Sequence, residues 1–131
     1  MKKILIGIIL LVVINLNANK IGKELFAKKC ASCHSILMPK DKSTMLAPPV
    51  RGIMHHMKEE FSSNEEIIKH IKSFVINPTK EDAICQSVQF FGLMPSQKGN
   101  VSKEELGEIA KWMITLNMTK EEHLKAFGKL P

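Results

Sequence analysis

Residues 30–34 read Cys-Ala-Ser-Cys-His, and this pentapeptide decides how the rest of the chain is interpreted. Cys30 and Cys33 are three positions apart, so a helical turn places both sulfur atoms on one side, and His34 follows directly. At this spacing two cysteines form thioether bonds to the vinyl groups of a haem, and the histidine binds the haem iron. The motif therefore predicts one covalently attached c-type haem, with Cys30 and Cys33 as attachment points and His34 as an iron ligand.

Three other uses of the two cysteines fit less well. A thioredoxin-type dithiol follows a strand in a βαβ unit, whereas Cys30 and Cys33 end a predicted helix. A zinc site needs a fourth ligand, which Cys85 or a histidine could supply, but the chain has no second Cys-x-x-Cys pair. A structural disulfide leaves His34 without a function. Cys85 lies outside the motif, and we expect it to be buried and inert; a link between two molecules is the alternative.

The first 18 residues have the layout of a secretory signal peptide. Lys2 and Lys3 form a positive start, residues 4–14 are almost entirely apolar, and residues 15–18 form a short polar exit. The apolar run is shorter than the roughly 20 residues that a membrane-spanning helix needs. We therefore predict that residues 1–18 are removed on export, that residues 19–131 form one domain, and that the mature protein is periplasmic. An uncleaved membrane anchor is the alternative.

The chain carries a modest basic excess, with 19 Lys and Arg against 13 Asp and Glu, a net charge of +6. Removing Lys2 and Lys3 leaves 17 of the 19 basic residues, so the net charge falls from +6 to +4. Arg51 is the only arginine, and no basic tract with interleaved aromatic residues is present, which argues against nucleic-acid binding. Six Phe, one Trp and no Tyr are a small aromatic supply for a core, which a large apolar cofactor would help to fill.

The remaining sequence predicts helices joined by irregular loops, with no alternating strand pattern. A serine or threonine followed three residues later by glutamate, which is typical of a helix amino terminus, occurs at Ser63, Ser102 and Thr119. The apolar residues that follow Ser63 and Ser102 fall on one helical face. They are Ile67, Ile68, Ile71, Phe74 and Val75 in the first helix, and Leu106, Ile109, Ala110, Met113 and Ile114 in the second. The chain therefore predicts a small all-α domain.

Two further helices and two long loops complete the predicted fold. We expect a first helix over about residues 20–33 and a short helix from Thr79 towards Phe90. Residues 35–62 and 91–101 are interpreted as loops because each contains prolines and glycines. Long loops in a compact domain usually serve a function.

With these features the chain resembles the small monohaem cytochromes c over about residues 21–116. Gly22 and Phe26 lie eight and four residues before the motif. In that family the glycine lets the carboxy-terminal helix approach and the aromatic residue packs on that helix, which Ile109 and Trp112 match here. The resemblance implies a cytochrome c fold of three to five helices around one haem, with the amino- and carboxy-terminal helices packed crosswise.

Two loop motifs extend the resemblance. Residues 47–52, Ala-Pro-Pro-Val-Arg-Gly, look like the family loop whose proline carbonyl accepts the ring hydrogen of the haem histidine, a place that Pro48 would take. Residues 92–95, Gly-Leu-Met-Pro, look like the loop that carries the second iron ligand, so the resemblance implies that Met94 completes the axial pair with His34. Four histidines stay open as replacements for Met94: His55, His56, His70 and His123, of which the first two lie in a predicted loop.

The resemblance also implies an electron carrier and not an enzyme, because two filled axial positions leave the iron no site for a substrate. We expect a monomer that exchanges single electrons with redox partner proteins and associates transiently with membrane respiratory complexes. Seven lysines lie in segments that could surround an exposed haem edge. They would favour a redox partner whose docking surface is acidic. They are Lys28, Lys29, Lys40, Lys42, Lys58, Lys80 and Lys98. Two alternatives stay open: a haem sensor or peroxidase-like protein with an open or displaceable sixth ligand, and a fixed electron-transfer subunit of a larger enzyme complex.

Overall fold

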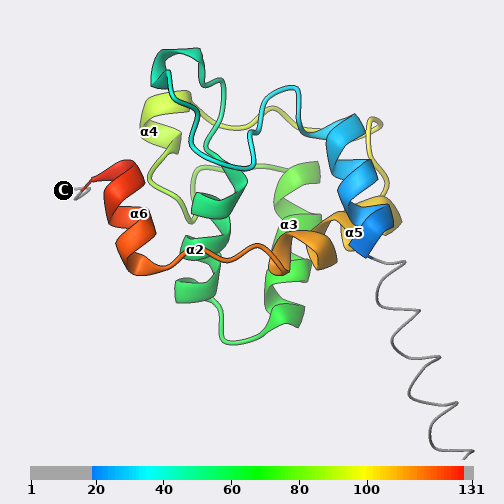
Figure 1. Cartoon of the computed structure of the whole chain (residues 1–131). Coiled ribbons are helices and arrows are strands. Elements are labelled where there is room, and N and C mark those ends of the chain that lie inside the picture. Colours follow the sequence, from blue (N-terminus) through cyan, green and yellow to red (C-terminus); the bar gives the residue numbers. More distant parts are fainter. Residues whose placement is uncertain (1–18, 129–131) are drawn as a thin grey trace, which may run out of the picture.

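The computed structural model describes residues 19–128, and these residues form helices joined by loops (Figure 1). The helices are the amino-terminal helix over residues 19–29, the 3-10 helix η1 (Lys42–Thr44), α2 (Val50–Glu60), α3 (Asn64–Ile76), α4 (Val88–Phe91), α5 (Lys103–Ile114) and α6 (Lys120–Phe127). Extended pairing within the described residues is limited to one isolated bridge between Lys98 and Val101. The all-α fold class is confirmed, whereas the predicted signal peptide, residues 1–18, lies outside the described residues.

Three helices begin where the sequence predicted them, and each begins with a capping box. The side chain of Ser63 accepts a hydrogen bond from the backbone N–H of Glu66, whose carboxylate accepts from the backbone N–H of Ser63. The same reciprocal pair begins α5 at Ser102 and α6 at Thr119. Such a box satisfies backbone donors that the first helical turn leaves without partners.

The predicted loop over residues 35–62 is wrong in its second half, which forms the eleven-residue helix α2. Pro49 is the N-cap of α2, a position next to the helix start where a missing backbone N–H costs little. Val50, Met54 and Met57 recur at helical spacing and are buried. His55 and His56 therefore lie on a helix and not in a loop.

Two other predicted helices are shorter in the structure than in the sequence interpretation. The amino-terminal helix ends at residue 29, and Cys30 to Cys33 form turns. The helix expected from Thr79 is limited to α4. The hydroxyl of Thr79 donates to the carboxylate of Asp82 and accepts from its backbone N–H, but helical structure begins only at Val88. With α2 added, the described residues form six α-helices, one more than the resemblance implied.

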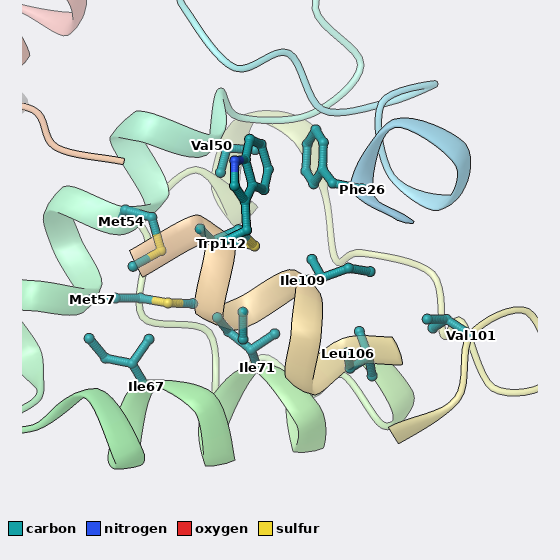
Figure 2. Packing of buried hydrophobic residues seen from close by; sticks show 12 residues of the cluster. Phe26, Val50, Met54, Met57, Ile67, Ile71, Val101, Leu106, Ile109 and Trp112 are labelled. Atoms are coloured by element: carbon teal, nitrogen blue, oxygen red, sulfur yellow. The ribbon is translucent and has the colours of Figure 1, made fainter. Parts of the chain in front are cut away.

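The core lies where the amino-terminal helix, α2 and α3 meet α5 (Figure 2). The rings of Phe26 and Trp112 lie with their centroids 4.9 Å apart. Gly22 permits this approach, because a Cβ atom there would lie 2.6 Å from Cβ of Trp112 and would overlap the carbonyl oxygen of Glu108. The predicted contact of the amino-terminal helix with the helix of Ile109 and Trp112, made through a glycine and an aromatic pair, is therefore present. That helix is α5, and α6 follows it.

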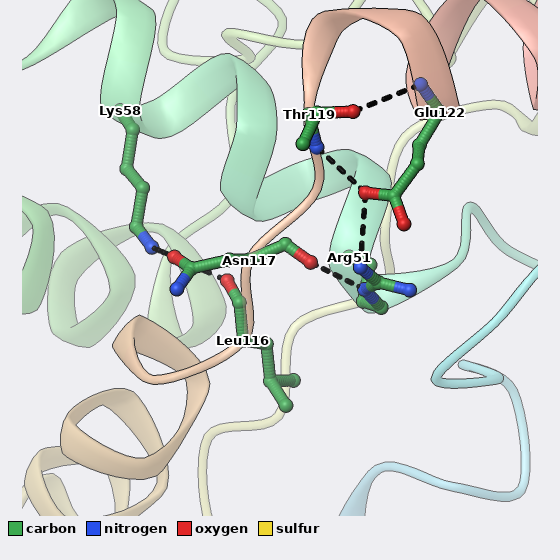
Figure 3. A network of polar contacts seen from close by, with 6 residues as sticks. All are labelled: Arg51, Lys58, Leu116, Asn117, Thr119 and Glu122. Carbon is green, nitrogen blue, oxygen red and sulfur yellow. Dashed lines mark hydrogen bonds and ion pairs between the residues drawn. The ribbon is translucent and has the colours of Figure 1, made fainter.

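A polar network attaches the segment between α5 and α6 to α2 (Figure 3). Arg51 donates to the carbonyl oxygen of Asn117 and forms an ion pair with Glu122 at 3.3 Å. Lys58 donates to the side-chain oxygen of Asn117 and to the carbonyl oxygens of Ile114 and Leu116. Because these donors lie on α2, α6 is held along the same helix that follows the Pro48 loop.

Candidate functional site

A cavity with predominantly apolar walls lies at the centre of the fold. The amino-terminal helix contributes Phe26, α3 contributes Ile71 and Phe74, and α5 contributes Leu106 and Ile109. The remaining walls come from α2 and from the loops on either side of α4. All five residues predicted to hold the haem line this one cavity: Cys30, Cys33, His34, Pro48 and Met94.

The Cys-x-x-Cys-His turn brings two free thiols to the cavity wall. The backbone N–H groups of Cys33 and His34 both donate to the carbonyl oxygen of Cys30, at 3.1 and 3.0 Å, which curls the chain tightly after the helix ends. Cys30 and Cys33 are not joined in a disulfide. Burial, and to a smaller extent the neighbouring Cys33, raises the pKa of Cys30 to about 11, so this thiol is protonated at neutral pH.

His34 is oriented by the Pro48 carbonyl, as the resemblance implied. The Nδ1 atom of His34 lies 2.9 Å from the carbonyl oxygen of Pro48. A carbonyl only accepts, so Nδ1 carries the hydrogen and Nε2 keeps a free lone pair, the form in which imidazole binds a metal. Burial lowers the pKa of His34, and the bond to Pro48 opposes this only in part, so the ring is neutral at neutral pH.

The backbone around this bond is itself held in place. The N–H of Val50 donates to the carbonyl oxygen of Ser35 at 2.8 Å, and the N–H of Arg51 donates to that of Ile36 at 3.2 Å. These bonds tie the start of α2 to the residues that follow His34. The position of Pro48 relative to the imidazole therefore depends on where α2 begins.

Met94 reaches the cavity from the loop between α4 and α5. Gly92 ends α4 with a φ of 76°, a conformation that favours glycine, and its N–H donates to the carbonyl oxygen of Val88. Beyond Met94, the N–H of Gln97 donates to the carbonyl oxygen of Val75 at 2.9 Å, and the hydroxyl of Ser96 donates to that of Ile76. The loop is thus attached to the end of α3 and presents a thioether to the cavity.

The histidines weighed as replacements for Met94 divide into two groups. His56 and His70 line the cavity, one from α2 and the other from α3. His55 and His123 do not line it, but both rings lie against His56. The sequence interpretation missed this contact, for which the adjacent pair at 55–56 and a histidine in the last predicted helix were the available signals. No group of three or more His, Cys, Asp or Glu side chains within residues 19–128 is arranged to hold a metal ion.

Cys85 is half-buried at the cavity wall and not enclosed in the core. Burial raises the pKa of its thiol, but hydrogen bonding to His56 and Ser87 outweighs this effect, so that the pKa is lowered overall. The expected full burial of Cys85 is therefore wrong, whereas its inertness stays a prediction.

The residues present fit a c-type haem. Two free thiols, a neutral imidazole with an open Nε2, and a thioether from a separate loop all face one apolar cavity, which is the donor set that thioether attachment and His/Met axial ligation require.

Within residues 19–128, no helix combines the length and apolar character needed to cross a membrane.

Comparison with known proteins agrees with this chemistry. A protein of Aquifex aeolicus (strain VF5), described as an uncharacterized protein, is 27% identical over a match that covers 86% of each chain. No solved structure matches the chain. The family described as cytochrome C oxidase, cbb3-type, subunit III matches residues 17–113, which leaves α6 outside the match, and its domain carries a covalently bound c-type haem with iron. The chain therefore belongs to this cytochrome C oxidase, cbb3-type, subunit III family and carries a monohaem cytochrome c domain.

Proposed function

We propose that this chain is an exported electron carrier in which Cys30 and Cys33 attach one haem and His34 and Met94 hold its iron. The observation that carries the proposal is the convergence of these four side chains on one apolar cavity, with Pro48 orienting the imidazole. When bound, the haem supplies a one-electron couple between ferric and ferrous iron. Electrons would pass singly between respiratory redox partners, and no bond in a substrate would be made or broken.

The chain's own residues prepare the site for this task. Burial keeps His34 neutral, the bond to Pro48 fixes one tautomer, and the loop carrying Met94 is attached to α3, which supports both residues as the iron ligands. Apolar walls exclude water, which favours the less charged ferrous state. With both axial positions filled, the iron has no open site for a substrate, which supports a carrier rather than an enzyme.

The lysines support an acidic docking partner only in part. Lys58 donates to carbonyl groups of the α5–α6 linker, and Lys29 and Lys42 donate to the carbonyl oxygens of Asn100 and Ala126. All seven lysines are exposed, and the four that form no such hydrogen bond are the freest to meet an acidic partner. These four are Lys28, Lys40, Lys80 and Lys98.

For the ends of the chain, we propose cleavage after residue 18 and a periplasmic domain over residues 19–131, on the length of the apolar run at residues 4–14. A monomeric shuttle that meets membrane complexes transiently is the form that the exposed lysines favour. A fixed subunit of a larger enzyme complex is the second candidate, since the family description itself names an oxidase subunit. Purification from membranes under mild detergent separates these two, because a fixed subunit co-purifies stoichiometrically with its complex.

The first test is a pyridine haemochrome assay on the exported protein. A c-type spectrum that survives denaturation of the wild-type chain, and that is lost when Cys30 and Cys33 are both replaced by alanine, would support attachment through these thiols. If export alongside a working attachment machinery yields a colourless protein, the proposal is wrong.

The second test addresses the sixth ligand. A ferric protein with Met94 on the iron has a weak long-wavelength sulfur-to-iron absorption band, which we expect to disappear in Met94→Leu and to persist in Met57→Leu, whose side chain lines the same cavity from α2. Carbon monoxide binding to the reduced wild-type protein at neutral pH would instead favour the sensor or peroxidase-like alternative.

A further inference from the structure

Three imidazole rings meet between α2 and α6, at a place that the proposed electron transfer does not use. The Nε2 atoms of His56 and His123 lie 3.2 Å apart. The ring of His55 is stacked on His123 with centroids 4.4 Å apart, and His56 meets His123 edge to face at 4.7 Å. His123 is only 7% exposed, and this buried polar side chain lies outside the apolar core cluster. We refer to His55, His56 and His123 as the imidazole cluster.

The geometry limits how protons can be arranged in the cluster. At 3.2 Å one of the two facing Nε2 atoms donates and the other accepts, so the pair holds a single hydrogen between them and titrates as a unit. Glu59 supplies a negative charge beside the same rings, with its carboxylate 3.5 Å from Nε2 of His55 and 3.8 Å from Nδ1 of His56. A first added proton would therefore be stabilised by the carboxylate of Glu59, whereas a second would be repelled by the positive charge of the first.

Other ionisable groups border the cluster on each side. Cys85 faces His56 from the loop before α4, and this contact raises the pKa of His56. Burial lowers the pKa of His123, and the neighbouring imidazoles lower it further. The ion pair between Arg51 and Glu122 joins the same two helices. Near the end of α6, Lys42 donates to the carbonyl oxygen of Ala126.

The cluster is linked to the haem cavity through one of its members. His56 lines the cavity that also contains His34 and Met94, while its other side contacts His123 of α6. A charge placed on the pair is therefore close to the cavity, buried at His123 and partly exposed at His56, where electrostatic effects are stronger than at the open surface.

We propose that the imidazole cluster takes up one proton when the haem accepts an electron, so that electron transfer by this chain is coupled to proton binding. The inference rests on the proposed function. The electron comes from the redox donor and the proton from the solvent. An O–H bond of hydronium breaks as the N–H bond forms at the free ring nitrogen of the His56–His123 pair, and no other covalent bond changes. Oxidation returns both.

The direction of the coupling follows from the charges. Reduction removes one positive charge from the iron, which makes the cluster a better proton acceptor. Reciprocally, the protonated cluster makes the haem a better electron acceptor, since proton uptake by the cluster and electron uptake by the haem are thermodynamically linked. The midpoint potential should therefore fall as pH rises through the range in which histidine titrates, roughly pH 5 to 8.

The test is a spectroelectrochemical titration of the haem-loaded protein at several pH values across that range. We expect the wild-type midpoint potential to fall with pH, by no more than about 59 mV per unit, the one-electron equivalent of a tenfold change in proton concentration. In His123→Gln and in His56→Gln the slope should be lost or clearly reduced, since a glutamine cannot take up the proton.

A milder pair of variants tests the same idea without altering the rings. Glu59→Gln removes the carboxylate that stabilises the added proton, so the pH window of the slope should move to lower pH. Glu60→Gln, the next residue on α2 and also exposed, should leave the window unchanged. These positions are on the surface, so the variants are expected to fold.

Three outcomes would overturn the inference: a wild-type potential that is independent of pH, a slope retained in both His56→Gln and His123→Gln, or a slope abolished by His70→Gln alone. The second outcome would assign the proton to the haem itself, and the third to the other cavity histidine. Each of them still requires a haem that titrates with one electron. Absence of haem in the haemochrome assay would instead contradict the proposed function.

Discussion

At the scale of single residues, two glycines in helices have opposite surroundings. A side chain at Gly22 would meet the backbone carbonyl of Glu108 and Cβ of Trp112, neither of which can move without shifting α5. A side chain at Gly107 would meet nothing within 4 Å. The close contact between the amino-terminal helix and α5 thus depends on one glycine, while the other is replaceable.

We therefore expect Gly22→Ala to lower the free energy of unfolding by about 1–3 kcal/mol, the usual effect of overpacking. Gly107→Ala should raise it by roughly 0.5–1 kcal/mol, because alanine is the better helix former. Denaturant unfolding of both variants measures these changes. Equal destabilisation by the two substitutions would contradict the close packing at Gly22.

The capping serine of α3 offers a second comparison, at the scale of the element. Ser63→Ala removes the hydroxyl that accepts from the N–H of Glu66 and should cost about 1 kcal/mol of stability. Ser62→Ala is the matched control, since Ser62 is exposed and takes part in the box only through its backbone N–H. Thermal or denaturant unfolding should show a decrease for the first variant and almost none for the second.

The attachment of α6 is also a property of an element. Lys58→Met keeps an apolar stem but removes the hydrogen bonds to Ile114, Leu116 and Asn117. Since each of the three bonds contributes about 1 kcal/mol, local opening of α6 should become roughly a hundredfold more frequent while the rest of the protein is unaffected.

Hydrogen exchange resolved by residue measures this effect. The amides of α6 should exchange faster in Lys58→Met and those of α3 should not change. Lys69→Met, an exposed lysine on α3, serves as the control and should leave both helices as they are. Uniformly faster exchange in Lys58→Met would mean that this lysine supports the whole fold and not only the linker.

At the scale of the whole molecule, the histidines determine how stability depends on pH. Burial lowers the pKa of His70, which lies between the rings of Phe61 and Phe74, and Asp82 opposes the effect only in part. A histidine whose pKa is lower in the folded state than its ordinary 6.5 binds more protons when unfolded. Its contribution is complete above that value and is lost as the pH falls below it.

We therefore expect the free energy of unfolding to fall between pH 7 and pH 5, and to fall less in His70→Gln. Denaturant titrations at the two pH values, on wild type and variant, give this difference directly. His56, whose pKa is raised, acts in the opposite direction. An identical pH dependence in the variant would show that His70 is as accessible to protons in the folded state as in the unfolded chain.

Also at this scale, the imidazole cluster depends on where α6 packs. The family match ends at residue 113, so the helix that brings His123 to His56 lies beyond it. Contacts of α6 with α2 include the ring of Phe127, which occupies the space beside Gly52 that a side chain would fill. The imidazole cluster is therefore a consequence of α6 packing on α2.

The sequence by itself determined the features that depend on spacing along the chain. The Cys-x-x-Cys-His motif predicted the cofactor, and the capping boxes at Ser63, Ser102 and Thr119 predicted where three helices begin, because each is satisfied by atoms within a single turn. The cavity-lining positions of His34, Pro48 and Met94 also agree with the sequence interpretation, although their binding of haem stays a prediction.

Only the tertiary structure decided the features that join distant segments. The prolines and the glycine of residues 48–52 favoured a loop, and α2 forms nevertheless because its apolar face is buried against α5. His56 and His123 are 67 positions apart, and no local pattern relates them. Their contact arises from the packing of α6 on α2, since burial of apolar surface between helices depends on the whole fold and not on neighbouring residues.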